Sequence, residues 1–230
     1  MIIALNNKSN LDKYEFLDYQ ERINRIDSKE QIIVCPTFLN IGNYTIRKFS
    51  LGAQNVSSTE EGAHTGEVSA KALKSFGVDY CIVGHSERRQ NQKESNNEIN
   101  KKIKQLMAQD IIPILCIGET KEERDNNHYK EIIEEEIKTA ILSVPNYDTI
   151  IIAYEPIWSI GTGVIPTNEQ IEEVFSLIKS ILPNNKILYG GSANEKNIDQ
   201  LKKIKNNDGF LLGGLSLKPA ELSIFLNKLI

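Results

Sequence analysis

The chain has 230 residues, of which 40% are hydrophobic and 25% are charged, and its formal net charge is −4. This composition is typical of a globular enzyme. The acidic balance argues against a nucleic acid or an anionic membrane as a partner, because both are bound by basic surfaces. No apolar run approaches the roughly 18 residues that a membrane helix needs. The N-terminus lacks the basic region and long apolar core of a signal peptide, so we expect a cytoplasmic protein.

The three cysteines are Cys35, Cys81 and Cys116, and each lies inside an apolar run far from the other two. An odd and widely spaced set favours neither a disulfide framework nor a metal-ligand pattern. We therefore expect buried, reduced thiols and no metal site.

Short apolar runs alternate with longer amphipathic segments along the whole chain. In chain order, the predicted strands lie at residues 1–5, 31–35, 49–54, 79–84, 111–118, 149–155, 186–190 and 209–214. They are continuously apolar and rich in Ile and Val, which is typical of parallel strands covered on both faces.

Between these runs, apolar residues recur at helical spacing in segments 96–107, 128–142 and 167–182. Thr167 and Gln170 form the pattern of a capping box at the start of the third segment. The second segment carries an acidic run, Glu134 to Glu136, which we interpret as the solvated face of its helix.

Eight such β–α units, with no linker and no break in composition, predict an α/β fold. We expect one closed (β/α)₈ barrel, with eight parallel strands and outer helices, spanning 1–230 as a single domain. The competing architecture is a doubly wound open sheet. Against it, no G-x-G-x-x-G follows the first strand and no Walker-type motif is present.

Unusual polar residues fall where the predicted strands end. Asn6 and Lys8 follow the first strand, His85 and Glu87 follow the fourth, and Glu155 ends the sixth. Each alone could be an ordinary loop or ion-paired residue. In a barrel, however, all strand ends meet at one rim, where the active site is built. Together they predict such a site.

Two glycine clusters follow strands seven and eight, at residues 190–192 and 213–214. Glycines there let backbone N–H groups approach an anion closely, and the barrel rule puts a phosphate site in these two loops. Ordinary tight turns are the alternative. Gly161 could add a further amide.

A phosphate site beside these side chains suggests proton abstraction next to a carbonyl group. Glu155 would be the base, held on rigid backbone and shielded from water. His85 and Lys8 would stabilise the negative charge that develops on the carbonyl oxygen, with Asn6 assisting.

The chain resembles the triosephosphate isomerase family in seven successive motifs: NNKSN, GAQNVSSTEEGAHTGEVS, IVGHSERR, CIGET, AYEPIWSIGTG, LYGGSA and GFLLGGLSLKP. They follow the family's order from residue 6 to residue 219, and GHSERR together with AYEPIWSIGTG is highly specific. The resemblance implies interconversion of dihydroxyacetone phosphate and glyceraldehyde 3-phosphate through an enediolate, without a cofactor.

Residue by residue, the resemblance implies that Glu155 is the base, His85 the electrophile, Lys8 the substrate-site lysine and Asn6 its neighbour. The family is the standard example of a glutamate base working with a neutral histidine. Here too, His85 opens the segment after strand four, where a helix N-terminus would disfavour its charged form.

The remaining implied site residues bind phosphate or support the first group. The phosphate-binding positions are Gly161, Ser192, Gly213 and Gly214, and the supporting positions are Glu87 near Lys8 and Cys116 near the base. Residues 156–166 would form a mobile lid, because an enediolate phosphate left in water eliminates phosphate. For Cys116 the alternatives are packing alone, which we favour, and tuning of Glu155.

The family's homodimer interface is implied by the loop around Thr65, Gly66 and Glu67, which would reach the neighbour's residues 6–10. Four features depart from the family pattern: Asn7 replaces a tryptophan, Ser9 a larger apolar residue, His64 an aromatic residue, and 164–166 a more polar hinge.

Two other functions remain open from the residues. One is another phosphate-binding barrel enzyme, such as a sugar-phosphate isomerase or an aldolase; an aldolase needs a Schiff-base lysine inside a strand, whereas Lys8 lies at a strand end. The other is a catalytically silent binding module, which the presence of Lys8, His85 and Glu155 disfavours.

Overall fold

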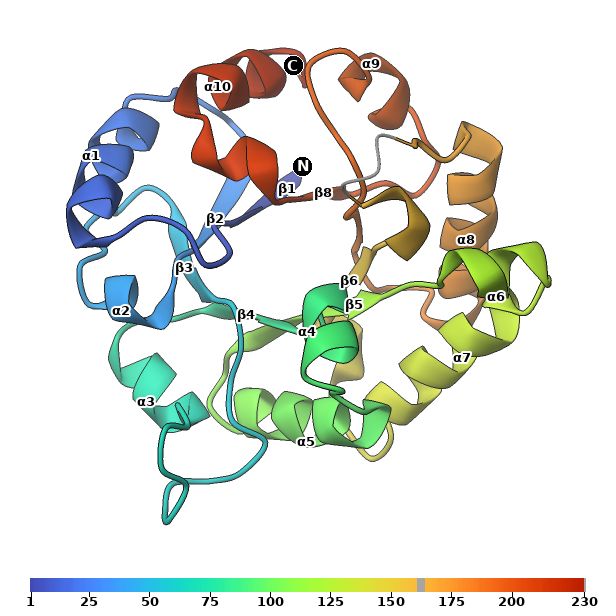
Figure 1. The fold of residues 1–230 in the computed structure, drawn as a ribbon, viewed down its shortest axis with the longest axis horizontal. Coiled ribbons are helices and arrows are strands. Elements are labelled where there is room, and N and C mark those ends of the chain that lie inside the picture. The colour runs from blue at the N-terminus through green and yellow to red at the C-terminus, as the bar shows by residue number, and fades with distance from the viewer. Residues whose placement is uncertain (161–163, 230) are drawn as a thin grey trace.

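The computed structural model describes residues 1–160 and 164–229, and within them eight parallel strands close into a barrel in chain order (Figure 1). The strands are β1 (Ile2–Asn6), β2 (Gln31–Cys35), β3 (Ser50–Ala53), β4 (Tyr80–Val83), β5 (Ile112–Ile117), β6 (Ile151–Tyr154), β7 (Ile187–Tyr189) and β8 (Gly209–Leu212). β8 pairs with β1, with Ile2 opposite Gly209. The predicted barrel and each of its predicted strands are confirmed.

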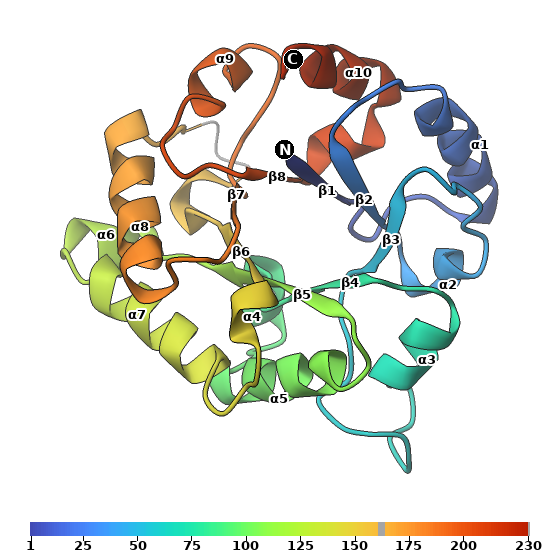
Figure 2. The same cartoon turned by 180° about the vertical axis from the view of Figure 1, so that it is seen from behind.

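Helices form an outer ring around the strands, as both faces of the molecule show (Figures 1 and 2). They are α1 (Lys13–Asn24), α2 (Phe38–Ile41), α3 (Ala70–Ser75), α4 (Ser86–Asn91), α5 (Asn96–Met107), α6 (Lys121–Asp125), α7 (Tyr129–Ala140), α8 (Asn168–Ile181), α9 (Ile198–Leu201) and α10 (Pro219–Asn227). The described residues also form three short 3₁₀ helices in loops: η1 (Tyr147–Thr149), η2 (Ile157–Ser159) and η3 (Gly214–Leu217). Within the described chain, no helix is both long and apolar enough to cross a membrane.

The apolar core has two layers because successive strand side chains point to opposite faces. In β1, Ala4 points into the barrel, whereas Ile3 and Leu5 pack outward against the helices. Both layers are buried, which explains why the strands read as continuous apolar runs. The three cysteines are buried and free, as predicted, and burial raises the pKa of the Cys35 thiol to about 12.

The amphipathic helices pack as their spacing predicts, with one exception. α8 begins with the predicted capping box of Thr167 and Gln170. In α7, Glu135 is exposed, but Glu136 is only 6% exposed, so the interpretation of the acidic run as a solvated face is wrong for Glu136. The reason is helical geometry: position 136 lies on the buried stripe that includes Ile133, Ile137 and Ala140.

Candidate active site

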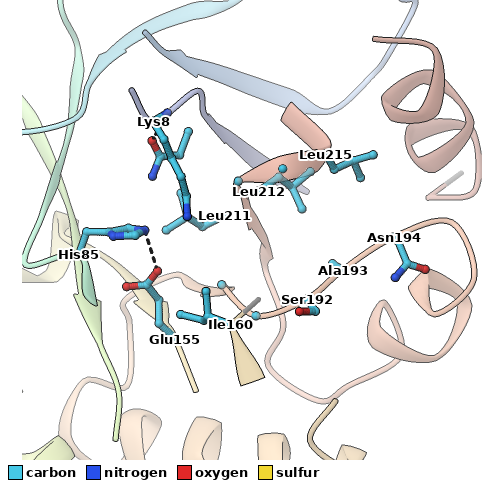
Figure 3. Close-up of a pocket in the computed structure, with 15 residues that line it drawn as sticks. Lys8, His85, Glu155, Ile160, Ser192, Ala193, Asn194, Leu211, Leu212 and Leu215 are labelled. Carbon is cyan, nitrogen blue, oxygen red and sulfur yellow. Dashed lines mark hydrogen bonds and ion pairs between the residues drawn. The ribbon is translucent and has the colours of Figure 1, made fainter. Parts of the chain in front are cut away.

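A cavity of about 310 Å³ opens at the carboxyl ends of the strands and gathers most of the predicted site residues (Figure 3). Of those residues, Asn6, Lys8, His85, Glu155, Ser192, Gly213 and Gly214 line it. Glu87 lines the neighbouring groove beside Lys8, Cys116 is buried inside the barrel, and Gly161 falls outside the described residues. Figure 3 shows Glu155 and His85 facing one another across the cavity floor, with Lys8 above them.

Glu155 is buried immediately after β6, and its two oxygens have different partners. Oε1 lies 3.0 Å from Nε2 of His85, and Oε2 accepts a 3.0 Å hydrogen bond from the backbone N–H of Ser86. Burial raises the pKa of the Glu155 carboxyl, but His85, the Ser86 N–H and the Cys116 thiol lower it by more. The net pKa lies below its ordinary value, so Glu155 is a carboxylate at neutral pH.

His85 caps the N-terminus of α4, where sequence reasoning expects it. Its Nδ1 accepts a hydrogen bond of 3.2 Å from the backbone N–H of Glu87. This acceptor role requires an unprotonated Nδ1, so the proton of the neutral imidazole is on Nε2, which faces Glu155. Burial is the largest single effect and lowers the pKa of His85, but the charge and hydrogen bond of Glu155, together with the charge of Glu87, raise it by more, so the net direction is upward. The helix N-terminus disfavours the charged form of His85, whereas the Glu155 carboxylate favours it.

Lys8 has a left-handed backbone, with φ of 52°. Such a conformation costs a non-glycine residue on the order of 1 kcal/mol and must be held by its surroundings. Asn6 Oδ1 accepts from the Lys8 N–H at 3.0 Å, and Gln54 donates to the Lys8 carbonyl at 2.8 Å. The Lys8 ammonium lies 2.5 Å from Glu87 Oε1. These contacts direct the ammonium toward the cavity.

The glycine loops after β7 and β8 lie against the charged side chains. A Cβ on Gly190 would come within 2.9 Å of Glu155 Cγ, and one on Gly213 within 3.0 Å of Lys8 Cε. The absence of side chains at these positions thus makes room for the base and the lysine. Ser192 donates to the Ser159 carbonyl at 3.1 Å, which joins the β7 loop to the segment after β6.

Glu119 is a buried site neighbour for which sequence reasoning assigns no role. Its Oε1 accepts hydrogen bonds from Trp158 Nε1 at 2.9 Å, Arg124 Nε at 2.8 Å and the Tyr154 hydroxyl at 3.1 Å. The tryptophan beside the predicted base is thereby fixed to the end of β5. Glu119 belongs to the CIGET motif, but this motif does not indicate that Glu119 contacts Trp158.

The positions that depart from the family pattern have separate environments. Asn7 is buried and donates to the Tyr19 hydroxyl at 3.2 Å and to Ser216 Oγ at 3.3 Å. Ser9 and His64 are exposed. In the part of the chain that the structure describes, no three His, Cys, Asp or Glu side chains cluster as metal ligands do.

Known proteins resemble this chain over nearly its whole length. The family model described as triosephosphate isomerase matches residues 1–229. A triosephosphate isomerase of Mesomycoplasma hyopneumoniae (strain 232) is 42% identical over 212 residues, covering 90% of this chain and 87% of the relative. Those of Clostridium tetani and Gloeothece citriformis are 38% and 37% identical, covering 90% and 96% of this chain and 88% and 94% of the relatives. The chain therefore belongs to the triosephosphate isomerase family.

Proposed function

We propose that this protein is an isomerase that interconverts dihydroxyacetone phosphate and glyceraldehyde 3-phosphate. Family membership over the whole chain supports the reaction. The single observation that supports the chemistry is the contact between an ionised, buried Glu155 and the Nε2 of His85 inside the rim cavity. A base and a proton donor are thus already adjacent where substrate would bind.

In this proposal Glu155 removes a proton from the carbon next to the carbonyl and returns it to the neighbouring carbon. The lowered pKa of Glu155 keeps it ready to accept that proton at neutral pH. Because Oε1 now contacts His85, substrate must replace this contact, so that each group faces a different part of the enediolate. Burial strengthens both new interactions by excluding water.

His85 and Lys8 stabilise the enediolate oxygen in this mechanism. The neutral imidazole presents Nε2–H as a hydrogen-bond donor, and the Lys8 ammonium supplies positive charge across the cavity. Asn6 supports the Lys8 backbone and lines the same cavity. Cys116 packs inside the barrel, and its thiol comes after His85 and the Ser86 N–H among the groups that lower the pKa of Glu155.

The phosphate group would bind to the loops after β7 and β8. Ser192, Gly213 and Gly214 line the cavity on that side, and η3 begins at Gly214, so its first N–H groups lie at the end of β8. Gly161 is proposed as a further contact from the sequence alone. The proposed lid spans 156–166, and its residues 161–163 are not among those that the structure describes. Near its N-terminal end, Trp158 donates a hydrogen bond to Glu119.

Proton NMR in D₂O tests this function with dihydroxyacetone phosphate as the only triose. The wild type should exchange a carbon-bound hydrogen and also produce glyceraldehyde 3-phosphate. An aldolase could catalyse exchange but not this conversion, and a silent binding module would do neither. Glu155→Gln should lose both activities, and undiminished exchange in this variant would remove Glu155 as the base. For His85→Ala we expect turnover lower by on the order of 10²-fold, as for loss of an oxyanion donor.

We also propose a homodimer built on the α1–α3 side of the barrel. The segment that carries Thr65, Gly66 and Glu67 extends outward between β3 and α3 (Figures 1 and 2). Leu39 in α2 and Phe76 directly after α3 are 89% and 61% exposed, and an interface on this side would cover them. A groove of about 340 Å³ beside Lys8 and Ser9 offers a place for the partner's loop.

Sedimentation at the concentration of the activity assay tests this assembly. A fully active monomer would contradict it. The free cysteines accord with a reducing compartment, and we propose that the protein acts in the cytoplasm.

A further inference from the structure

Glu136 belongs to an outer helix, yet its carboxylate reaches the ends of two barrel strands. Oε1 lies 3.2 Å from Nη1 of Arg89, and Oε2 accepts a 2.9 Å hydrogen bond from the backbone N–H of Gly118. The side chain is 8% exposed. Burying a carboxylate costs desolvation free energy even when it is paired, so the contacts of Glu136 indicate a role beyond stability.

Arg89 connects Glu136 to Gly84, the residue before His85, and to the end of β5. Its Nε donates to the Gly84 carbonyl at 2.8 Å, and its Nη2 donates to the Cys116 carbonyl at 3.2 Å. Gly84 directly precedes His85 and has a φ of +68°, so this turn depends on being held from outside. One guanidinium therefore joins the ends of β4 and β5.

Gly118 transmits the second contact to Glu155. A Cβ on Gly118 would lie 1.8 Å from the Glu155 carbonyl oxygen, so the two backbones are in direct contact. The Glu155 N–H also donates to the carbonyl of Ile117, the residue before Gly118, at 2.8 Å. The two oxygens of Glu136 thus bind the supports of both proposed catalytic groups.

The charge of Glu136 changes close to neutral pH. Burial raises the pKa of its carboxyl to about 7, against the lowering effects of Arg89 and the Gly118 N–H. Glu123 in α6 and Glu119 in the loop before it add to the rise, and the buried Cys116 thiol of β5 faces the same carboxylate. As the pH falls through this value, the carboxylate that neutralises Arg89 is lost.

We propose that Glu136 is a positioning residue for the isomerisation, holding the His85 and Glu155 strand ends together through Arg89 and Gly118 only while it is ionised. The proposal rests on the proposed function. When Glu136 is protonated, Arg89 keeps its acceptors on Gly84, Cys116 and Asn96 but loses its carboxylate, and the strand ends lose their common anchor.

The kinetic test compares kcat with dihydroxyacetone phosphate between about pH 5.5 and 9, because kcat reports groups of the enzyme–substrate complex and not of free substrate. Wild type should show an acid-side loss centred near pH 7. Glu136→Gln should lack that step and have a kcat at high pH lower by roughly tenfold, since misplacing a catalytic group by an ångström can cost about 10²-fold. Glu135→Gln, on the exposed face of the same helix, should match wild type, and Glu136→Asp should keep the step.

A second measurement does not depend on activity. The amide proton of Gly118 bonds directly to Glu136, so its NMR shift should titrate near pH 7 in wild type and not in Glu136→Gln. A step that persists unchanged in Glu136→Gln would assign it to His85 and overturn the proposal, as would a Gly118 amide that does not titrate. An inactive wild type would instead reject the proposed function.

Discussion

Replacing Glu136 by Gln should change how the free energy of unfolding depends on pH. The ordinary pKa of a glutamate is 4.5, whereas burial raises that of Glu136 to about 7 in the folded protein. Below pH 4.5 the carboxyl is protonated in both states, and its burial carries no charge penalty. Between these two values the unfolded chain gives up its proton first, so stability falls as the pH rises. Above pH 7 the loss is complete.

The size of the loss follows from the two pKa values. A difference of about 2.5 pH units is worth about 3 kcal/mol at 1.36 kcal/mol per unit. Glutamine has the same shape and does not titrate. We therefore expect the stability of Glu136→Gln, relative to wild type, to rise by about 3 kcal/mol between pH 4.5 and 8. The pH-independent part of the difference in free energy of unfolding depends on how Arg89 interacts with glutamine, and the prediction concerns only the part that changes with pH.

Urea denaturation at a series of pH values measures this difference directly. Protein concentration must stay fixed, because a homodimer would make apparent stability depend on it. Equal m-values would show that both proteins unfold from states of similar compactness. Glu135→Gln is the matched control, and its difference from wild type should not vary with pH. Parallel curves for wild type and Glu136→Gln between pH 5 and 8 would refute the reasoning.

Three further substitutions test the fold and the site. Phe175→Ala removes a fully buried ring of α8 and should cost about 3–5 kcal/mol in urea denaturation while leaving kcat near wild type. Gly118→Ala would press a Cβ to 1.8 Å from the Glu155 carbonyl, so we expect a large loss of kcat or of folded protein by circular dichroism. Trp158→Phe leaves the buried Glu119 without one of its donors, and a thermal or urea scan should show a loss of about 1–3 kcal/mol.

The barrel and the rim were predictable because their signals are local. A parallel strand covered on both faces reads as a short apolar run, and the closed topology then brings every strand end to one side. His85, Glu155 and Lys8 interrupt such patterns, so they stand out in the sequence before any contact is known. All three line the cavity at the rim.

The supports of these residues were not predictable in the same way. Gln54 holds the Lys8 carbonyl and Glu119 holds Trp158, but each is a single polar residue near a strand end with many possible partners. Which one it contacts depends on the stagger of neighbouring strands. Glu136 is different, because the helical period puts it beside Ile137 on the buried stripe; the charge of its neighbours led to the wrong interpretation.

The buried carboxylate of α7 brings stability and activity into conflict. Protonation of Glu136 removes a buried charge, so the folded protein is more stable at mildly acidic pH. The same protonation removes the anchor that Arg89 and Gly118 share, so the proposed active geometry is best kept at the pH where the fold is weaker. A residue that served only the fold would favour glutamine or an apolar side chain at this position. Two results would therefore separate a positioning role from a structural one: the stability of wild type relative to Glu136→Gln falls as the pH rises, and the kcat step near pH 7, which rises with pH, is absent from Glu136→Gln.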